Sequence, residues 1–126
     1  DYKYLKRKNY PKNKNIKIIS QVSNLKKLIS YYDKSDILIL PSYVEAYPQV
    51  VLESLSRLRP IIIFNEIKYL KKTFSFGLFN CDRSSKSLIK NILKIKKNYN
   101  KIQLKISKNK IFTLENFHKD MNKIFK

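Results

Sequence analysis

Two glutamates, Glu45 and Glu53, stand eight positions apart in the segment PSYVEAYPQVVLES, residues 41–54. Pro48 lies between them and is typical of the first turn of a helix, where the N–H that proline lacks would have no partner. Free amides at a helix start favour an anion such as a diphosphate. They would belong to Tyr47, Gln49 and Val50. Because Glu53 could accept hydrogen bonds from two neighbouring hydroxyls, such as those of a ribose, the two carboxylates can address different parts of one nucleotide sugar.

The same residues also have simpler interpretations. Glu45 and Glu53 could be solvated carboxylates that the helix dipole favours near a helix start. Tyr47 could be an ordinary packed aromatic residue, and Arg57 and Arg59 are more typical of surface or helix-end charges than of phosphate ligands. The residues alone leave these alternatives open.

Strand and helix signals alternate along the chain. Short apolar runs predict strands at residues 16–19, 37–40, 61–64 and 77–79. Apolar residues at three- and four-residue spacing predict helices at 25–34, 48–58, 66–73 and 86–98, with further helix in 100–126. This alternation is typical of an α/β fold whose parallel sheet is covered by helices on both faces. Since ligands bind beyond the carboxyl ends of such strands, the loop at 41–47 is expected at the ligand edge.

Apolar runs and cap residues add detail to this expected fold. The continuous apolar run at 37–40 indicates a strand buried on both faces. The helix at 86–98 carries an apolar stripe opposite several lysines, which usually faces a core but could rest on anionic lipid. The stripe consists of Leu88, Ile89, Ile92, Leu93 and Ile95. Helix caps are available at Ser23 or Asn24 and at Ser84 or Ser85.

The formal charge of +19 invites nucleic acid as a partner, since release of counterions drives such binding. The excess is nearly all lysine, whereas bidentate recognition of phosphates and bases favours arginine. The lysines are also spread along the whole chain, which favours a bias of composition over a functional patch. Attraction to an anionic membrane surface or an acidic substrate is the second interpretation, and nucleic acid is the least favoured.

Cysteine content and hydropathy bear on the cellular compartment. The one cysteine, Cys81, cannot form an internal disulfide, so a reducing compartment is the simpler assumption. The longest apolar runs have strand length and fall short of the roughly 18 residues that a membrane helix needs. We therefore expect a cytoplasmic protein, with peripheral contact at the inner face of a membrane as a further option.

The run SDILILPSYVEAYPQVVLESLSRLRPIIIF closely resembles the C-terminal, donor-binding domain of the retaining glycosyltransferases of family four. These enzymes, of the GT-B type and glycosyl transferases group 1, have two Rossmann-like domains that face a cleft. Their pattern has a strand ending near Pro-Ser, then Glu-Gly-aromatic-Pro, a second Glu, a helix of small residues and a Pro-Val-Ile strand. The match is strong over about residues 36–64 and looser, but collinear, from 16 to 126.

The resemblance implies a role for each matching residue. Glu45 would lie by the donor sugar as the catalytic carboxylate, stabilising positive charge as the glycosidic bond loosens, and Glu53 would hold the ribose. The sugar and diphosphate would be lined by Ser42, Ala46, Tyr47, Gln49 and Val50. The donor would be a UDP- or GDP-sugar and the acceptor a glycan or a lipid-linked glycan, as in synthesis of surface polysaccharide or lipopolysaccharide. No metal and no other cofactor is expected, because helix starts and basic side chains can offset the diphosphate charge.

The chain departs from the family pattern in several places. Ala46 replaces a glycine and crowds the backbone approach to the sugar. Leu58 replaces the glycine that usually ends the helix, which is expected to remove the left-handed turn. Residues 1–15 are interpreted as a basic polar segment before a nucleotide-sugar-binding domain at 16–126. The first strand with its Arg/Lys pair and the N-terminal acceptor domain are not found, so we expect a fragment that is inactive alone. The alternative function is a non-catalytic basic α/β module that binds nucleic acid or an anionic membrane.

Overall fold

The computed structural model describes residues 14–46, 48–110 and 123. The chain divides into two compact units, residues 1–31 and 32–126. In the first unit, the described residues form an irregular segment that leads into helix α2 (Leu25–Lys34), whose last turn belongs to the second unit. The functional boundary expected at residue 15 stays a prediction, since residues 1–13 lie outside the described part.

The strand predicted at residues 16–19 is wrong. These residues form no strand, and the side chains of Ile16, Ile18 and Ile19 are exposed. A β-branched run favours extended backbone, but a strand also needs a hydrogen-bonded neighbour and a surface on which to pack. Among the described strands, β1 pairs with β2 and β2 with β3, and none pairs with this segment.

Helix α2 begins where the sequence predicted. The backbone N–H of Lys27 donates to Oδ1 of Asn24 at 3.0 Å, so Asn24 is the cap. This bond satisfies one of the amides that have no acceptor within the helix. None of the side chains of α2 is buried.

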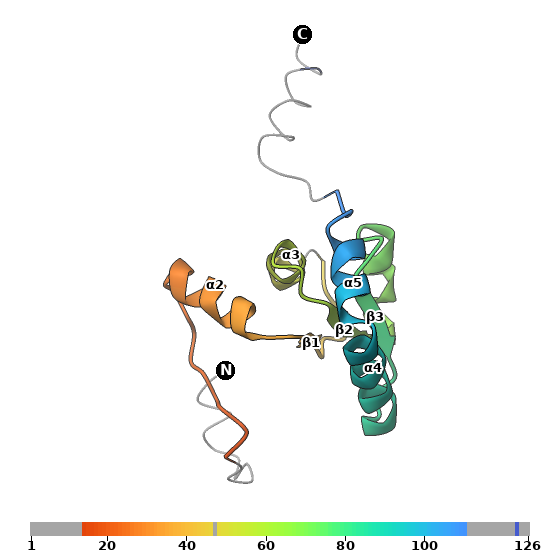
Figure 1. Ribbon diagram of the computed structural model, residues 1–126, viewed down its shortest axis with the longest axis horizontal. Coiled ribbons are helices and arrows are strands. Elements are labelled where there is room, and N and C mark those ends of the chain that lie inside the picture. Colours follow the sequence, from red (N-terminus) through yellow and green to blue (C-terminus); the bar gives the residue numbers. More distant parts are fainter. Residues whose placement is uncertain (1–13, 47, 111–122, 124–126) are drawn as a thin grey trace. The chain divides into compact units, whose positions relative to one another are not determined.

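The larger unit alternates strands and helices around a three-stranded parallel sheet (Figure 1). Its elements are β1 (Leu38–Leu40), α3 (Gln49–Ser56), β2 (Ile61–Phe64), the 3-10 helix η1 (Asn65–Lys72), β3 (Leu78–Cys81), α4 (Ser85–Lys97) and α5 (Tyr99–Ile106). The strand order is β1-β2-β3, with Leu38 opposite Ile61 and Ile61 opposite Leu78. The expected parallel sheet is therefore confirmed. Of the helix expected in 100–126, residues 111–122 and 124–126 lie outside the described part.

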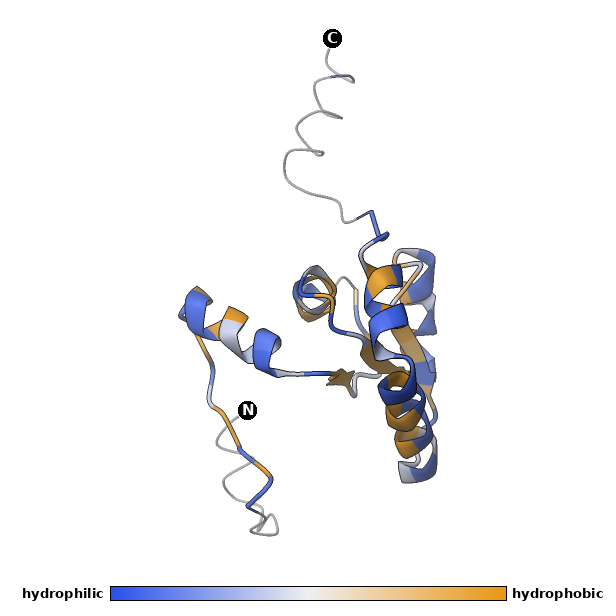
Figure 2. Cartoon of the chain, viewed as in Figure 1, coloured by the Kyte–Doolittle hydropathy of each residue, from blue (hydrophilic) through white to orange (hydrophobic). Residues whose placement is uncertain are grey.

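Helices cover both faces of this sheet. Ile61 and Ile63 of β2 pack with Val51 and Leu55 of α3 and with η1. The residue between them, Ile62, packs on the other face with Ile95 of α4. Successive side chains of a strand point to opposite faces, so one fully buried strand supplies both cores. Figure 2 shows the strands hydrophobic, while the helices around them carry both kinds of residue. The fold is α/β and Rossmann-like, as predicted.

One expectation about burial is wrong, and a second is confirmed only in part. Strand β1 is not buried on both faces, because the side chain of Ile39 is 41% exposed; β1 has only β2 beside it in the described sheet. On α4, Ile95 is buried and Leu88 and Ile92 pack against the core, but Ile89 and Leu93 are exposed. Since successive residues of a helix turn by about 100°, a five-residue apolar stripe was too wide for one sheet face. The predicted cap of α4 is confirmed at Ser84, which accepts from the N–H of Ser87 at 3.2 Å.

Helix α3 ends in a left-handed turn at Leu58, whose φ is 58°. The N–H of Arg59 donates to the carbonyl of Ser54 and the N–H of Leu58 to that of Leu55, each at 2.9 Å. This pair of hydrogen bonds is the usual closure around a left-handed residue. The expectation that a leucine removes this turn is therefore wrong. The turn forms although a left-handed residue other than glycine costs about 1–2 kcal/mol.

The turn before β3 does need the single glycine of the chain. Gly77 has a φ of 97°. A Cβ built there would lie 2.6 Å from Cδ2 of Leu55 and 2.8 Å from Cγ1 of Ile106. Both the backbone conformation and the lack of space exclude a side chain at this position.

Candidate functional site

The carboxyl ends of the three parallel strands gather a set of polar and aromatic side chains. Tyr43, after β1, meets the ring of Phe64 edge to face, with ring centroids 6.1 Å apart. The guanidinium carbon of Arg83, after β3, lies 3.9 Å from the centroid of the Tyr43 ring. Arg83 also pairs with Glu66 at 2.5 Å. These contacts join the loop after β1 to the residues that follow β2 and β3, so the predicted position of this loop at the carboxyl edge is confirmed.

Glu45 is held in this loop through its backbone. Its N–H donates to the hydroxyl of Tyr69 at 3.1 Å, and that hydroxyl donates to its carbonyl oxygen. Tyr69 belongs to η1, which follows β2. One tyrosine therefore satisfies both backbone groups of Glu45 and leaves its partly buried carboxylate free of these bonds.

The loop leads into α3 at Pro48. Pro48 is the cap residue, with φ −71° and ψ 113°, and its carbonyl accepts from the N–H of Val51 at 3.0 Å. It thus lies just before the first turn, one position earlier than predicted. No side chain caps this helix start and its first turn carries no acidic residue. The first amides of α3, those of Gln49 and Val50, have no acceptor within the helix.

The remaining predicted site residues lie around this helix start. Ser42 and Val50 are partly buried, while Ala46 and Gln49 are exposed. Tyr47 lies outside the described residues. The assigned roles of all these residues in binding a donor stay predictions.

Glu53 lies in the second turn of α3 and has a partner that the sequence did not indicate. The hydroxyl of Tyr32 donates to its Oε2 at 2.7 Å. Partial burial of Tyr32, together with the hydrogen bond to Glu53 and its negative charge, raises the pKa of the Tyr32 hydroxyl above its usual range. Tyr32 therefore remains a donor at neutral pH and orients one oxygen of the carboxylate, leaving the other oxygen without this partner.

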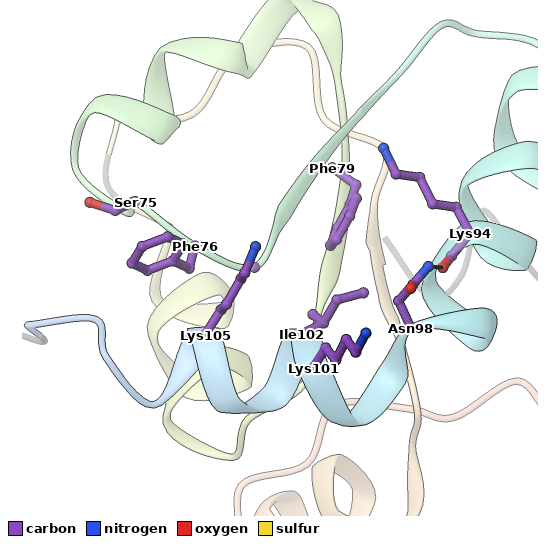
Figure 3. Close-up of a pocket in the computed structure, with 9 residues that line it drawn as sticks. Ser75, Phe76, Phe79, Lys94, Asn98, Lys101, Ile102 and Lys105 are labelled. Carbon is purple, nitrogen blue, oxygen red and sulfur yellow. Dashed lines mark hydrogen bonds between the residues drawn. The ribbon is translucent and has the colours of Figure 1, made fainter.

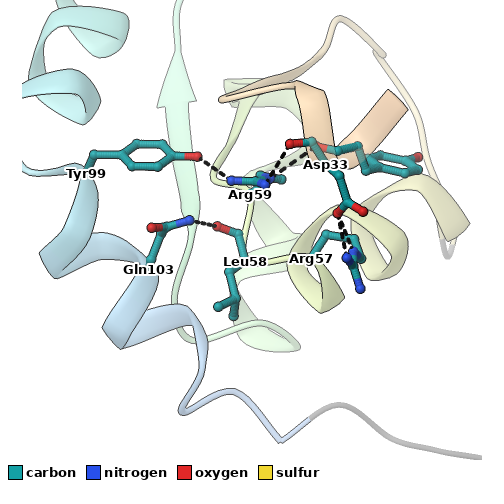
Figure 4. A network of polar contacts seen from close by, with 7 residues as sticks. Asp33, Arg57, Leu58, Arg59, Tyr99 and Gln103 are labelled. Carbon is teal, nitrogen blue, oxygen red and sulfur yellow. Dashed lines mark hydrogen bonds and ion pairs between the residues drawn. The ribbon is translucent and has the colours of Figure 1, made fainter. Parts of the chain in front are cut away.

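Arg59 fixes the backbone at the end of α2, where it donates to the carbonyl of Asp33 (Figure 4). Its guanidinium donates to the carbonyl oxygens of Tyr32 at 3.1 Å and Asp33 at 2.9 Å, at the end of α2, and to the hydroxyl of Tyr99 at 3.1 Å. Arg57 pairs with the Asp33 carboxylate at 2.6 Å. Both arginines therefore act at helix ends, as the simpler interpretation had it. Arg59 caps two carbonyls at the end of α2, of which that of Tyr32 also accepts from the N–H of Ser35 at 3.1 Å.

The structure thus places the two glutamates on different supports. Glu45 is fixed by Tyr69, 24 positions later, and Glu53 by Tyr32, 21 positions earlier. Neither tyrosine carries a sequence signal, because only the packing of η1 and the end of α2 brings each to its glutamate. Arg83 likewise has no sequence signal that links it to Tyr43, because it follows β3 while Tyr43 follows β1.

Within the described part of the chain, no group of three or more His, Cys, Asp or Glu side chains could hold a metal ion. The prediction that no metal is needed stays a prediction. None of the described helices has the length and apolarity needed to cross a membrane.

A cavity of about 460 Å³ opens at the opposite end of β3 (Figure 3). Phe76, Phe79 and Ile102 form its apolar wall. Its cationic border consists of Lys94, Lys101 and Lys105. It contains none of the predicted site residues and lies by the amino end of β3, whereas ligands of such sheets bind at the carboxyl ends.

The comparisons with known proteins identify the family. The family model described as glycosyl transferases group 1 matches residues 1–111. Neither the curated proteins nor the solved structures gave a match. The family match spans most of the 126 residues and includes the whole carboxyl-edge site. The chain therefore belongs to the glycosyl transferases group 1 family, whose general activity is glycosyl transfer.

Proposed function

We propose that this chain binds the nucleotide-sugar donor of a retaining glycosyltransferase of family four. The donor is a UDP- or GDP-sugar, and the sugar moves to a glycan or a lipid-linked glycan in the synthesis of surface polysaccharide or lipopolysaccharide. The reaction takes place in the cytoplasm, at the inner face of a membrane. Transfer would also need an acceptor-binding domain of the kind found in these enzymes. We therefore assign donor binding, and not transfer, to residues 1–126.

The start of α3 is the element that we assign to the diphosphate. Its first amides point along the helix axis without intrahelical acceptors, and the helix dipole adds partial positive charge. The absence of an acidic residue from the first turn of α3 leaves this end open to an anion. Arg83 adds a guanidinium at the same edge of the sheet. Together these groups would offset the charge that the diphosphate gains as it leaves.

Glu53 is the residue that we assign to the ribose. A carboxylate accepts hydrogen bonds strongly from hydroxyls and can bind two of them. The hydroxyl of Tyr32 uses one of the two lone pairs of Oε2. The other lone pair of Oε2 and both lone pairs of Oε1 would accept from the ribose diol. Glu53 lies in the second turn of α3, about one turn after the first amides, which would hold the diphosphate.

Glu45 is the residue that we assign to the donor sugar. When the bond from the sugar C1 to the diphosphate oxygen breaks, C1 and the ring oxygen gain positive charge while the diphosphate gains negative charge. A carboxylate held beside the sugar stabilises that positive charge in the transition state, provided that it is already oriented. The two hydrogen bonds with Tyr69 support this preorganisation.

The observation that carries the proposal is the placement of both glutamates on the loop and helix that follow β1, at the carboxyl edge of the sheet. The test is thermal melting of the full chain with UDP- and GDP-sugars. At least one of them should raise the melting temperature, since a ligand that binds the folded state stabilises it. Glu53→Ala should abolish the rise, whereas Asp36→Ala, at an exposed carboxylate before the amino end of β1, should keep it.

Failure of every UDP- and GDP-sugar to raise the melting temperature would contradict the proposal. Tight binding to DNA with a steep salt dependence would then favour the alternative of a nucleic-acid-binding module.

A further inference from the structure

Helix α4 presents two large apolar side chains away from the core. The side chain of Ile89 is 55% exposed and that of Leu93 is 60% exposed. They stand four positions apart, so they lie on the same face of the helix, one turn after the other. Leu88, Ile92 and Ile95, which pack on the sheet, centre roughly 110° around the helix from this pair. The exposed pair therefore contributes little to the core.

Lysines border this pair on both sides. At about 100° per residue, Lys96 lies on one side of Ile89 and Leu93, while Lys86 and Lys90 lie on the other. All three lysine side chains are exposed. We call the surface formed by these three lysines with Ile89 and Leu93 the outer α4 face. Both kinds of residue are visible along the helix in Figure 2.

The charge of the surrounding segment has one sign only. Residues 84–110 contain nine lysines and no aspartate or glutamate. The lysines are Lys86, Lys90, Lys94, Lys96, Lys97, Lys101, Lys105, Lys108 and Lys110. Every acidic residue in the described part of the chain precedes residue 84. Among the described residues, all carboxylates thus precede α4, and the charged side chains of α4 and α5 are cations alone.

We propose that the outer α4 face docks on an anionic membrane surface, with Ile89 and Leu93 among the lipid headgroups and the lysines against lipid phosphates. A helix with an apolar centre and cationic borders suits the boundary between headgroups and acyl chains. Each lysine near an anionic surface strengthens binding by about fivefold. This helix lies on the membrane, since it is too short and too polar to cross it.

A nucleic acid fits the outer α4 face less well. A phosphate backbone would meet the lysines but would gain nothing from two aliphatic side chains between them. Residues 84–110 also contain no arginine, the residue that forms bidentate contacts with bases and phosphates. The aliphatic pair is therefore the feature that distinguishes lipid from nucleic acid.

Docking in this way would hold the donor site near lipid-linked acceptors. Helix α4 begins at Ser85, directly after the carboxyl end of β3, which is the edge that carries Arg83 and the loop of Glu45. The inference deepens the membrane location that we propose above. It can be tested separately, because donor binding is read from melting and membrane binding from vesicles.

A single tryptophan gives a direct readout, since the chain contains none. In the full chain, Leu93→Trp should shift its fluorescence to the blue with vesicles of equal parts phosphatidylcholine and phosphatidylglycerol, and not with phosphatidylcholine alone. The matched control is Thr73→Trp, an exposed position at the end of η1, on the other side of the sheet. Its emission should not change. Equal shifts at both positions, or none at Leu93→Trp, would overturn the proposal.

Co-sedimentation with the same vesicles separates apolar insertion from charge. The double variant Ile89→Gln with Leu93→Gln should weaken binding at least about tenfold, while its donor-induced melting shift stays that of the unchanged chain. Leu104→Gln, at an equally exposed leucine of α5, should bind as before. Lys86→Gln with Lys90→Gln should weaken binding more than Lys68→Gln with Lys71→Gln on η1. Vesicle binding that survives the Ile89 and Leu93 changes in full would contradict docking through this face.

Discussion

The hydroxyl of Tyr32 donates a hydrogen bond to Oε2 of Glu53 at 2.7 Å, and so ties the end of α2 to the carboxylate predicted to bind ribose. The guanidinium of Arg59 holds the carbonyl of the same Tyr32 at 3.1 Å. The orientation of the Glu53 carboxylate therefore depends on two successive contacts, from Arg59 in the turn after α3 to Tyr32 and from Tyr32 to Glu53. Positioning of this kind lowers the cost of binding, since the carboxylate need not be ordered by the ligand.

Replacing the tyrosine by phenylalanine removes this contact and little else. Tyr32→Phe should lower the stability by at most about 1 kcal/mol, the net value of an ordinary hydrogen bond. It should also weaken binding of a UDP- or GDP-sugar by a few fold, because the Glu53 carboxylate loses its fixed orientation. Denaturant unfolding measures the first effect and titration calorimetry the second. An unchanged donor affinity together with lower stability would show that Tyr32 has a structural role alone.

The stability of the chain should depend on Tyr32 at high pH. The pKa of its hydroxyl is raised in the folded state, so the contribution is fully present below the usual tyrosine value of about 10. Above that pH the unfolded chain loses the proton while the folded chain keeps it, and stability falls as pH rises. The difference in unfolding free energy between the unchanged chain and Tyr32→Phe should therefore shrink above about pH 10. A difference in unfolding free energy that stays constant above this pH would contradict a raised pKa of Tyr32 in the folded chain.

Tyr69→Phe should loosen the loop that carries Glu45. Without the hydroxyl, the backbone N–H of Glu45 loses its acceptor, and its hydrogen exchange should become faster. Donor affinity should fall as well, since a less ordered loop must be fixed on binding. The control is Tyr43→Phe, which keeps the aromatic ring beneath Arg83. Equal exchange rates at Glu45 in the Tyr69→Phe variant and the unchanged chain would refute this role.

Leu58→Gly should give a more stable chain than Leu58→Ala. Glycine takes the left-handed conformation of this turn without the cost of about 1–2 kcal/mol, although its greater freedom in the unfolded chain offsets part of the gain. We expect a net gain of about 0.5–1 kcal/mol. Leu58 is 36% exposed, so its removal also loses packing, and the gain is therefore stated relative to Leu58→Ala, which loses nearly the same packing. Leu58→Ala keeps the strain and should give no gain, and an equal or greater gain for alanine in chemical unfolding would exclude strain as the cause.

The core of the fold could be predicted because its central strand is a continuous apolar run. The run at 61–63 is apolar at every position, and a strand with both faces buried is what the structure contains. The loop position followed from the same reasoning, since Pro41 ends β1 and ligands of parallel sheets bind beyond that end. The caps at Asn24 and Ser84 were predictable because a short polar side chain satisfies a nearby amide locally.

The features that sequence reasoning missed all depend on contacts between distant segments. The isoleucines at 16–19 have strand propensity but no partner strand in the described sheet. Ile89 and Leu93 fit the helical pattern, yet they are exposed because they lie around the helix from the residues that pack on the sheet. Leu58 takes a conformation that its side chain disfavours, because the hydrogen bonds of Arg59 and Leu58 to the helix end impose it. Tyr32 and Tyr69 could not be assigned to the glutamates from spacing.

Glu53 is assigned to the ribose of a nucleotide sugar, and the affinity for a donor with a modified ribose tests this assignment most directly. Calorimetry would compare the preferred UDP- or GDP-sugar with its 2′,3′-dideoxy analogue on the unchanged chain and on Glu53→Ala. The unchanged chain should prefer the natural donor by roughly tenfold to hundredfold, the value of hydrogen bonds to a charged group. Glu53→Ala should bind both donors equally and weakly. A preference for the natural ribose that Glu53→Ala retains in full would contradict the account.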